Sequence, residues 1–296
     1  MANQEKKDAS AAQKRVTVPR LLQLKSEGQK IAMVTAYDYP SACLADAAGV
    51  DMLLVGDTLG MTVLGYESTL PVTMEDMLHH TRAVARGTKR AMVVADMPFL
   101  SYQGNADEAV INAGRLLKEG GAHAVKLEGG ARLAPLVSRL VDSGIPVVGH
   151  LGLLPQSLRQ LGGYRAQGKT SEGARRLLQD AKVLEEAGAC SIVLEVVPAP
   201  LAAAISERLS IPTIGIGAGA GCDGQVQVMH DLLGITEWTP RHARRFAELG
   251  AAIRTAFESY AQAVREGSFP GPENSLEMDP EELRKALEDD TRADDC

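Results

Sequence analysis

Residues 186–194 read EAGACSIVL, a stretch in which a charged helix end, a glycine and an apolar strand follow one another. Two other stretches repeat this order, AAGVDMLLV at 47–55 and EGGAHAVKL at 119–127. Their glycines, Gly188, Gly49 and Gly120, stand where a helix needs a left-handed residue to stop before the next strand. The repeated unit predicts that helices alternate with strands along the chain.

Eight β-rich runs lie between residues 31 and 231, mostly separated by helical patterns. They are 31–38, 52–57, 91–97, 124–130, 146–152, 191–198, 212–219 and 225–231. Near-continuous apolar strands separated by helices indicate a parallel sheet that is buried on both faces. Eight such units predict an α/β fold, a closed (β/α)8 TIM barrel in a single domain, for which about 250 residues is an ordinary length.

One connection does not fit a regular barrel. Only about five residues separate the last two runs, too few for a crossover helix, so either that helix is vestigial or one of the two strands is wrongly assigned. A doubly wound open sheet is the alternative fold, but TAYDYPSA (35–42) stands where such a sheet carries its glycine-rich loop. GIGAGAG (215–221) resembles a phosphate-cradling loop, and tight barrel packing explains it equally well.

The chain divides into three parts. Residues 1–16 are polar and expected to be flexible, 17–268 form the catalytic barrel, and 269–296 are a linker and an acidic tail that is expected to be flexible. Within the second part, 18–28 predict a lead-in helix and 237–267 a long closing helical region. The net charge of −7 is concentrated in residues 277–296, which hold nine acids and three bases. The remainder is near neutral, which predicts neither a nucleic-acid partner nor a membrane-surface patch.

Cysteine use and the N-terminus indicate the compartment. The four cysteines are far apart and form no CxxC pair, which argues against a zinc site and a disulfide framework. No apolar run has the length of a membrane span, and the N-terminus lacks the apolar core of a signal peptide. We therefore expect a cytoplasmic protein.

Polar residues stand at the carboxyl ends of the predicted strands, where the active sites of such barrels are found. They are Asp57, Asp96, Lys126, Glu128, His150 and Glu195. Carboxylates without a thiolate or a histidine pair favour Mg²⁺ over zinc. Glu195 is flanked by apolar residues, so burying its carboxylate is costly unless it has a role, and it is a candidate general base.

Each of these residues also has a purely structural interpretation. Asp57 would cap the turn that begins at Thr58, and Asp96 would brace its own loop before Pro98. Lys126 and Glu128 are two apart on one strand face and would form an ion pair inside the barrel. His150 would be an ordinary core histidine. Because all of them lie at matching depth on successive strands, the functional interpretation is favoured.

Several motifs resemble the ketopantoate hydroxymethyltransferase family. They are VTAYDYPSA (34–42), VGDTLGMTVLGYESTLPVTMEDM (55–77), VVADMPFLSY (93–102), AVKLEGG (124–130), VVGHLGLLPQS (147–157), GGYRAQG (162–168), VLEVVP (193–198) and IGIGAGAGCDGQVQVMHDLLG (214–234). The resemblance runs in order from about residue 16 to 270. It implies a (β/α)8 barrel related to phosphoenolpyruvate mutase and isocitrate lyase.

The resemblance also implies a reaction. Members transfer a hydroxymethyl group from the co-substrate 5,10-methylenetetrahydrofolate to 3-methyl-2-oxobutanoate through a Mg²⁺-stabilised enolate, giving 2-dehydropantoate for pantothenate biosynthesis. One Mg²⁺ per subunit and a homo-oligomer, typically a decamer, are implied as well.

Site residues follow by position from the resemblance. It implies that Asp57, Asp96 and Glu128 hold or surround the metal and that Glu195 accepts the proton. The keto acid would contact Asp57, Thr58, Asp96, Lys126 and His150. The family more often has Ser at position 58, so Thr58 keeps the hydroxyl and adds a methyl group that would tighten the pocket.

Two other functions compete with this one. A carbon–carbon or carbon–phosphorus lyase of the same superfamily is disfavoured because no cysteine lies in a motif comparable with the reactive loop of those lyases. A non-catalytic, metal-binding scaffold is disfavoured because Asp57, Asp96, Glu128 and Glu195 are all present.

Overall fold

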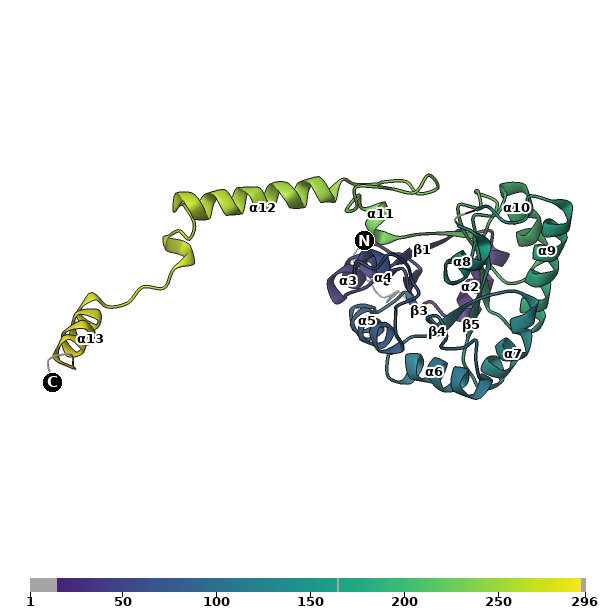
Figure 1. Ribbon diagram of the computed structural model, residues 1–296, viewed down its shortest axis with the longest axis horizontal. Helices are drawn as coiled ribbons and strands as arrows, with labels where there is room; N and C mark the ends of the chain where they lie inside the picture. The colour runs from purple at the N-terminus through teal and green to yellow at the C-terminus, as the bar shows by residue number, and fades with distance from the viewer. Residues whose placement is uncertain (1–14, 164, 294–296) are drawn as a thin grey trace, which may run out of the picture.

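A computed structural model describes residues 15–163 and 165–293. Its centre is a closed barrel of eight parallel strands in sequence order, which excludes the open-sheet alternative (Figure 1). The strands are β1 Ile31–Thr35, β2 Met52–Val55, β3 Met92–Asp96, β4 Ala124–Glu128, β5 Val147–Gly152, β6 Ser191–Glu195, β7 Thr213–Ile216 and β8 Gly224–Gln227. Each overlaps one of the eight predicted runs, so the predicted (β/α)8 barrel is confirmed.

Helices surround this barrel, and others extend from it. The helices of the barrel region are α2 Val18–Ser26, α3 Tyr39–Ala47, α4 Leu59–Thr62, α5 Met74–Gly87, α6 Ala106–Lys118, α7 Ala134–Asp142, α8 Leu158–Leu161, α9 Ser171–Glu186, α10 Ala199–Arg208 and α11 Met229–Leu232. The 3-10 turns are η1 Ala131–Leu133, η2 Pro155–Ser157 and η3 Pro272–Asn274. The C-terminal helices are α12 Leu249–Glu266 and α13 Pro280–Ala293. No helix in the described ranges has the length and apolarity needed to cross a membrane.

The repeated helix–glycine–strand unit forms largely as predicted. Gly49 and Gly188 adopt positive φ at their helix ends, whereas in the 119–127 copy the left-handed residue is Gly121 and not Gly120. A Cβ on Gly120 would overlap the carbonyl oxygen of Leu116, so glycine is required there by close packing. The prediction was therefore off by one residue in this copy.

Two apolar cores position the strands. The larger core lies between the strands and the surrounding helices, and the smaller one fills the inside of the barrel toward its amino end. Leu21 and Leu24 of α2 belong to the inner core together with Met33 and Met52, so the lead-in helix closes the bottom of the barrel. The carboxyl ends of the strands are left for polar groups.

The short link between β7 and β8 is genuine, and both strands are present. Residues 217–223 connect them without a helix, and the strands still pair in parallel. Seven extended residues span about 23 Å, enough to return along a four-residue strand of about 13 Å. A Cβ on Gly219 would overlap Ala199, and one on Gly221 would lie 2.6 Å from the Cβ of Ala203. The glycines thus let the loop lie directly on α10, which favours tight packing as the explanation of GIGAGAG.

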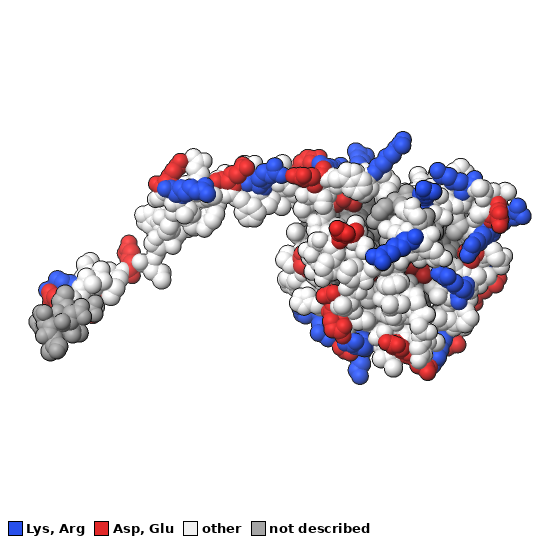
Figure 2. Space-filling model, viewed as in Figure 1, with Lys and Arg blue, Asp and Glu red and all other residues white. Residues whose placement is uncertain are grey.

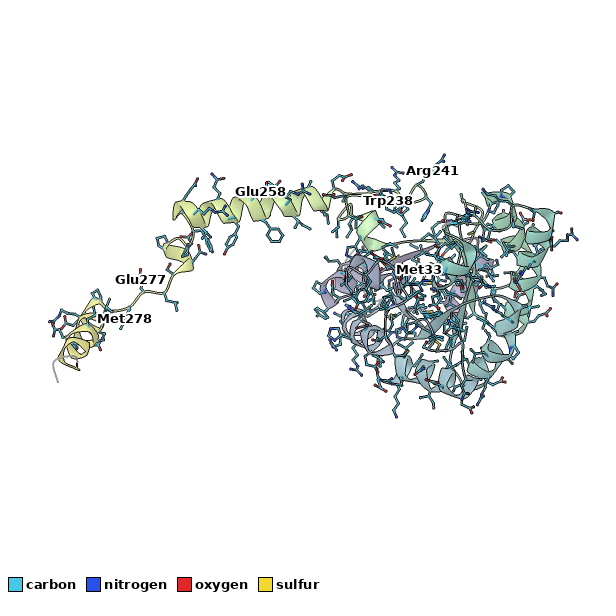
Figure 3. The ribbon with its side chains drawn as sticks, viewed as in Figure 1. Met33, Trp238, Arg241, Glu258, Glu277 and Met278 are labelled. Atoms are coloured by element: carbon cyan, nitrogen blue, oxygen red, sulfur yellow. The ribbon has the colours of Figure 1, made fainter. Side chains whose placement is uncertain are left out.

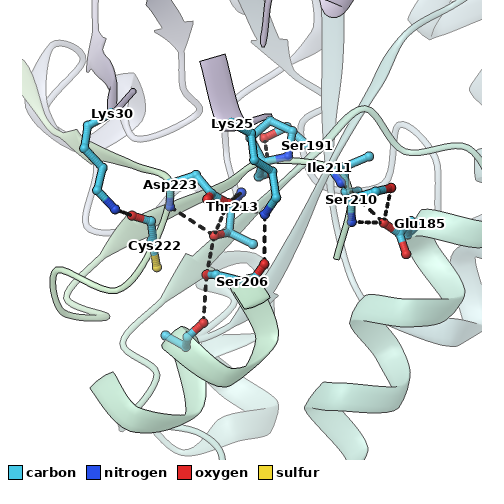
Figure 4. A network of polar contacts seen from close by, with 12 residues as sticks. Lys25, Lys30, Glu185, Ser191, Ser206, Ser210, Ile211, Thr213, Cys222 and Asp223 are labelled. Atoms are coloured by element: carbon cyan, nitrogen blue, oxygen red, sulfur yellow. Dashed lines mark hydrogen bonds and ion pairs between the residues drawn. The ribbon is translucent and has the colours of Figure 1, made fainter. Parts of the chain in front are cut away.

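Polar contacts tie this helix-free link to α2 (Figure 4). Lys25 Nζ lies 2.7 Å from Asp223 Oδ2 and donates to the carbonyl of Ser206. Asp223 Oδ2 also accepts from the backbone N–H of Thr213. Lys30 Nζ donates to the carbonyl of Cys222 at 2.6 Å. These contacts join the first helix to the last two strands.

The two ends of the chain differ from the predicted boundaries. Val16, predicted to lie in the flexible N-terminal segment, is buried, and its N–H donates to the carbonyl of Arg90. Residues 1–14 and 294–296 of the predicted flexible termini lie outside the described residues. Residues 280–293 of the predicted acidic tail form α13.

The predicted closing helical region does not close its own barrel. α12 projects away, with Glu258 on it and Met278 beyond it far from the barrel residue Met33 (Figures 1 and 3). On the visible face, charges of both signs are interspersed over the barrel and α12 (Figure 2).

Candidate active site

The polar residues predicted at the strand ends meet at the carboxyl mouth of the barrel. Asp96 and Glu195 end β3 and β6, Lys126 and Glu128 point inward from β4, and Asp57 follows β2. Parallel register places Asp96 beside Lys126 and Glu128 beside His150. Together with Thr58, all of these side chains line one cavity of about 50 Å³. The sequence therefore identified residues that the fold brings together.

Lys126 is held by an acidic neighbour from the next strand. Its Nζ lies 2.9 Å from Asp96 Oδ1 and 3.2 Å from His150 Nδ1, and the side chain is 5% exposed. Burial acts to lower the pKa of Lys126, but the carboxylates of Asp96, Glu128 and Asp57 outweigh burial and raise it. The ammonium is therefore a fixed positive charge in the cavity wall.

The three buried carboxylates differ in their ionisation. Burial, with repulsion from Asp96 and Glu128, raises the pKa of Asp57 well above its usual range. Burial also raises the pKa of Asp96 despite the contact with Lys126. For Glu128 burial acts in the same direction, but hydrogen bonding and attraction from His150, with Lys126, lower its pKa. With all three carboxylates ionised, the cavity would therefore hold more negative charge than the groups around it neutralise.

A hard divalent cation fits this charge. Among the described residues, no three His, Cys, Asp or Glu side chains are placed to hold a metal ion as they stand. Asp57 Oδ2 accepts from Gln156, but no described residue donates a hydrogen bond to its Oδ1. Oxygen donors with excess negative charge are the set that Mg²⁺ prefers, with water completing the coordination. Asp57 and Asp96, with Glu128 beside them, are the residues that could hold it.

Glu195 stands apart from this acidic group. Its Oε2 lies 3.1 Å from His150 Nε2, and its side chain is 15% exposed, which leaves it accessible from the cavity. Burial and Lys126 act to lower the pKa of His150, but Glu128 and Glu195 outweigh them and raise it to about 9. The next residue, Val196, has φ +49°, a left-handed conformation that is strained for a β-branched residue. Backbone strain of this kind is common at active sites, where it fixes the direction of a neighbouring side chain.

Gln156, in η2, is a site residue that the sequence reasoning did not select. Its Nε2 donates to Asp57 Oδ2 at 2.9 Å, and its backbone N–H donates to Glu128 Oε2 at 3.0 Å. Its Oε1 accepts from the hydroxyl of Tyr102 at 2.9 Å. Gln156 therefore connects two of the three carboxylates. The signal lay in the motif VVGHLGLLPQS, which contains it, but no rule for strand ends selects an amide in a turn.

Tyr37 is a second residue that the sequence reasoning missed. Its hydroxyl and that of Thr58 are 2.9 Å apart, and Tyr37 is 1% exposed. Burial raises the pKa of Tyr37, so its hydroxyl stays protonated and available to orient Thr58.

The purely structural interpretations of the site residues find little support. Thr58, not Asp57, is the N-cap of α4, and Asp96 accepts from the N–H of Asp57 and not from its own loop. Lys126 forms its ion pair with Asp96 on β3 and not with Glu128. His150 is a fully buried core residue, but it bridges Lys126 and Glu195. These contacts join strands through polar groups at one end of the barrel.

Comparison with known proteins identifies the family. The family model for ketopantoate hydroxymethyltransferase matches residues 15–272. The chain is 58% identical to 3-methyl-2-oxobutanoate hydroxymethyltransferase of Chloroflexus aurantiacus, over 92% of the chain and 97% of that protein. It is 60% identical to the protein of the same name from Syntrophus aciditrophicus, over 89% and 97%.

Solved structures of low identity share the fold alone. Phosphonopyruvate hydrolase matches with a TM-score of 0.58 and 15% identity over 94% of this chain and 97% of that one. 2,3-Dimethylmalate lyase, a member of the PEP mutase/isocitrate lyase superfamily, matches with 0.54 and 18% over the same shares. Coverage by the family model and identity above one half over nearly the whole length are decisive: the chain belongs to the ketopantoate hydroxymethyltransferase family of enzymes.

Proposed function

We propose that this enzyme transfers a hydroxymethyl group from 5,10-methylenetetrahydrofolate to 3-methyl-2-oxobutanoate, giving 2-dehydropantoate for pantothenate biosynthesis in the cytoplasm. The observation that carries the proposal is the division of the site into a carboxylate group (Asp57, Asp96, Glu128) and a separate carboxylate, Glu195, around one small cavity. Deprotonation next to a ketone needs both a stabilised oxygen and a base. Family membership supports the same reaction.

The residues divide the work as follows. Asp57 and Asp96, with Glu128, would hold one Mg²⁺ per subunit, which when bound acts as a Lewis acid toward the keto oxygen. Lys126 supplies positive charge beside the developing enolate, and Thr58 supplies a hydroxyl oriented by Tyr37. His150 holds Glu195 through Nε2. These groups line the one cavity that would receive the keto acid.

Glu195 is the proposed base. It takes the proton from C3, which leaves a carbanion there. The methylene carbon is bonded to two nitrogens of the carrier, and one water releases it from both as a formaldehyde unit, with one hydrogen of the water going to each nitrogen. The C3 carbanion adds to this carbon, and the alkoxide that forms takes the proton held by Glu195, so the reaction is balanced by one water.

The test isolates the first step. Exchange of the C3 proton with D₂O is followed by NMR with Mg²⁺ and without any folate. We expect wild type to exchange and Glu195→Gln to be slower by a factor on the order of 10² or more, because the amide keeps the shape but lacks basicity. Glu207→Gln on α10, which is exposed, serves as the control. Exchange at the wild-type rate in Glu195→Gln would remove Glu195 from this role and make His150 the next candidate.

We also propose that the enzyme is a homo-oligomer, with a decamer as the family resemblance implies. α12 carries Ile253, Phe257 and Val264 along one face, and these side chains are 42%, 69% and 46% exposed. A contiguous apolar face of this kind needs a partner surface. A second copy of the chain is the partner that is always present.

A further inference from the structure

A second, larger cavity lies beside the keto acid cavity. Its volume is about 520 Å³, and Glu128 lines both cavities. The walls come from the β3–α6 loop, the segment after β4, and the η2–α8 segment. The keto acid cavity, at about 50 Å³, cannot hold a large second substrate. Pockets for ligands of drug-like size are typically about 300–1,000 Å³, and the larger cavity falls in that range.

The lining suits a flat, polar-edged ring. Phe99 presents a partly exposed aromatic face, and Leu133 and Leu136 supply an apolar wall. Around them, Gln103 and Gln160 place amide donors and acceptors at the edge of the cavity. Apolar faces combined with a few amide groups are typical of sites that orient a heteroaromatic ligand.

The charge around the cavity suits an anionic tail. Among the described residues that line it, Glu128 is buried in the floor, and Arg132 is the charged side chain at the exposed rim. Gln160 belongs to residues 153–171, a segment without an acidic residue that carries Arg159, Arg165 and Lys169. Arg132 is therefore the cation that is placed to attract a carboxylate.

We propose that this cavity binds the one-carbon carrier, a reduced pterin with a carboxylate tail. The ring lies against Phe99, its edges meet Gln103 and Gln160, and the tail carboxylates face Arg132. Because Glu128 lines both cavities, the one-carbon unit would reach the keto acid past this residue, from the β4–β5 side. This inference rests on the proposed function.

Two variants test the cavity without touching the buried carboxylates. Arg132→Glu reverses the rim charge, and Ala106→Phe, at the first residue of α6, fills part of the space. Arg86→Glu, on the exposed face of α5, is the matched charge control. Each variant is assayed for the KM of methylenetetrahydrofolate, the KM of the keto acid and C3 exchange without folate. Binding of tetrahydrofolate to the Mg²⁺-loaded enzyme is titrated in parallel.

Both cavity variants should raise the KM of the carrier and the Kd of tetrahydrofolate at least tenfold. Keto acid KM and C3 exchange should stay within twofold of wild type, as should every value for Arg86→Glu. Carrier KM and tetrahydrofolate Kd within twofold of wild type in both folded variants would overturn the proposal. If wild type shows neither turnover nor exchange, the proposed function fails, and the tetrahydrofolate titration alone still decides whether the cavity binds the carrier.

Discussion

At the scale of single residues, Gln156 shows how a neutral side chain organises charged ones. Its amide uses both hydrogens, one on Asp57 and one on the carbonyl of Met97, and its oxygen accepts from Tyr102 and Gln103. It is 6% exposed, so none of these bonds is replaced by water if the amide is removed. Asp57 is therefore held by a neutral amide, that of Gln156, and not by a charged residue.

We predict that Gln156→Leu weakens Mg²⁺ binding by about 10–100-fold, the usual effect of losing a hydrogen-bonding partner of a metal ligand. The variant should also lose about 1–3 kcal/mol of stability, because buried acceptors are left unpaired. Calorimetric Mg²⁺ titration and thermal unfolding measure the two effects. Gln23→Leu, at an exposed position of α2, is the control, and wild-type Mg²⁺ affinity in Gln156→Leu would contradict the role.

The charged site residues could be predicted from the sequence, and Gln156 could not. Asp96 and Glu195 end apolar strands, and a barrel brings all strand ends to one rim. Gln156 instead lies in a 3-10 turn, and its partners Glu128, Tyr102 and Asp57 are 28, 54 and 99 residues away. No local pattern encodes contacts at those separations.

At the scale of elements, Glu185 fixes the end of α9 to the loop before β7 (Figure 4). Its Oε1 accepts from the backbone N–H and the hydroxyl of Ser210 and from the N–H of Ile211. Burial acts to raise the pKa of Glu185, but these bonds and Lys182 outweigh burial and lower it to about 2. The Glu185 carboxylate thus takes the place of a backbone carbonyl as the acceptor for these two N–H groups.

We predict that Glu185→Gln destabilises the protein by about 1–3 kcal/mol at pH 7, since charge-assisted hydrogen bonds are lost. The folded pKa lies below the unfolded value near 4.5, so the contribution is complete above pH 4.5 and fades as pH falls toward 2. The difference in unfolding free energy from wild type should therefore be smaller at pH 3.5 than at pH 7. Glu186→Gln, whose side chain is 63% exposed, is the neighbouring control. A difference that does not change with pH would show that the charge of Glu185 is not the cause.

The helices and strands could be predicted because, in most of the barrel, the spacing of the apolar residues agrees with the positions of the glycines that end helices. The exception is the β7–β8 link, where the sequence left open a vestigial helix or a wrongly assigned strand. The helix-free link is possible because Gly219 and Gly221 pack closely against Ala199 and Ala203. This contact joins separate segments of the chain, so the spacing of residues in the sequence does not reveal it.

At the scale of the whole molecule, the position of α12 is the feature least accessible from sequence. Its apolar residues at 253, 257 and 264 have the spacing of one helical face, so a packed helix was a sound prediction. The spacing indicates that this apolar face is covered. It does not indicate whether the chain's own barrel or another copy covers it. The loop with Trp238 and Arg241 lies over the barrel, where the N–H of Arg244 donates to Gln227 of β8, and the chain leaves its own strands only with α12 (Figure 3).

We predict that Phe257→Glu reduces the oligomer to smaller species. The side chain is 69% exposed on the isolated chain, so a charge there costs little in the monomer and is buried unpaired in an assembly. Light scattering coupled to size exclusion gives the mass. Glu258→Gln, the adjacent residue labelled in Figure 3, is the control. An unchanged mass for Phe257→Glu would place the contact between copies elsewhere.

Closure of the barrel by β1 and β8 has a consequence for biosynthesis. Ile31–Val34 pair with Gly224–Gln227, so the first strand has an open edge until nearly the whole barrel has left the ribosome. At about 5–20 residues per second, translation of the intervening segment takes on the order of ten seconds or more. During that interval the nascent chain presents apolar strand edges that can pair with other chains. Yield in a recombinant host should therefore depend on translation rate and on chaperone supply more than on the stability of the finished enzyme.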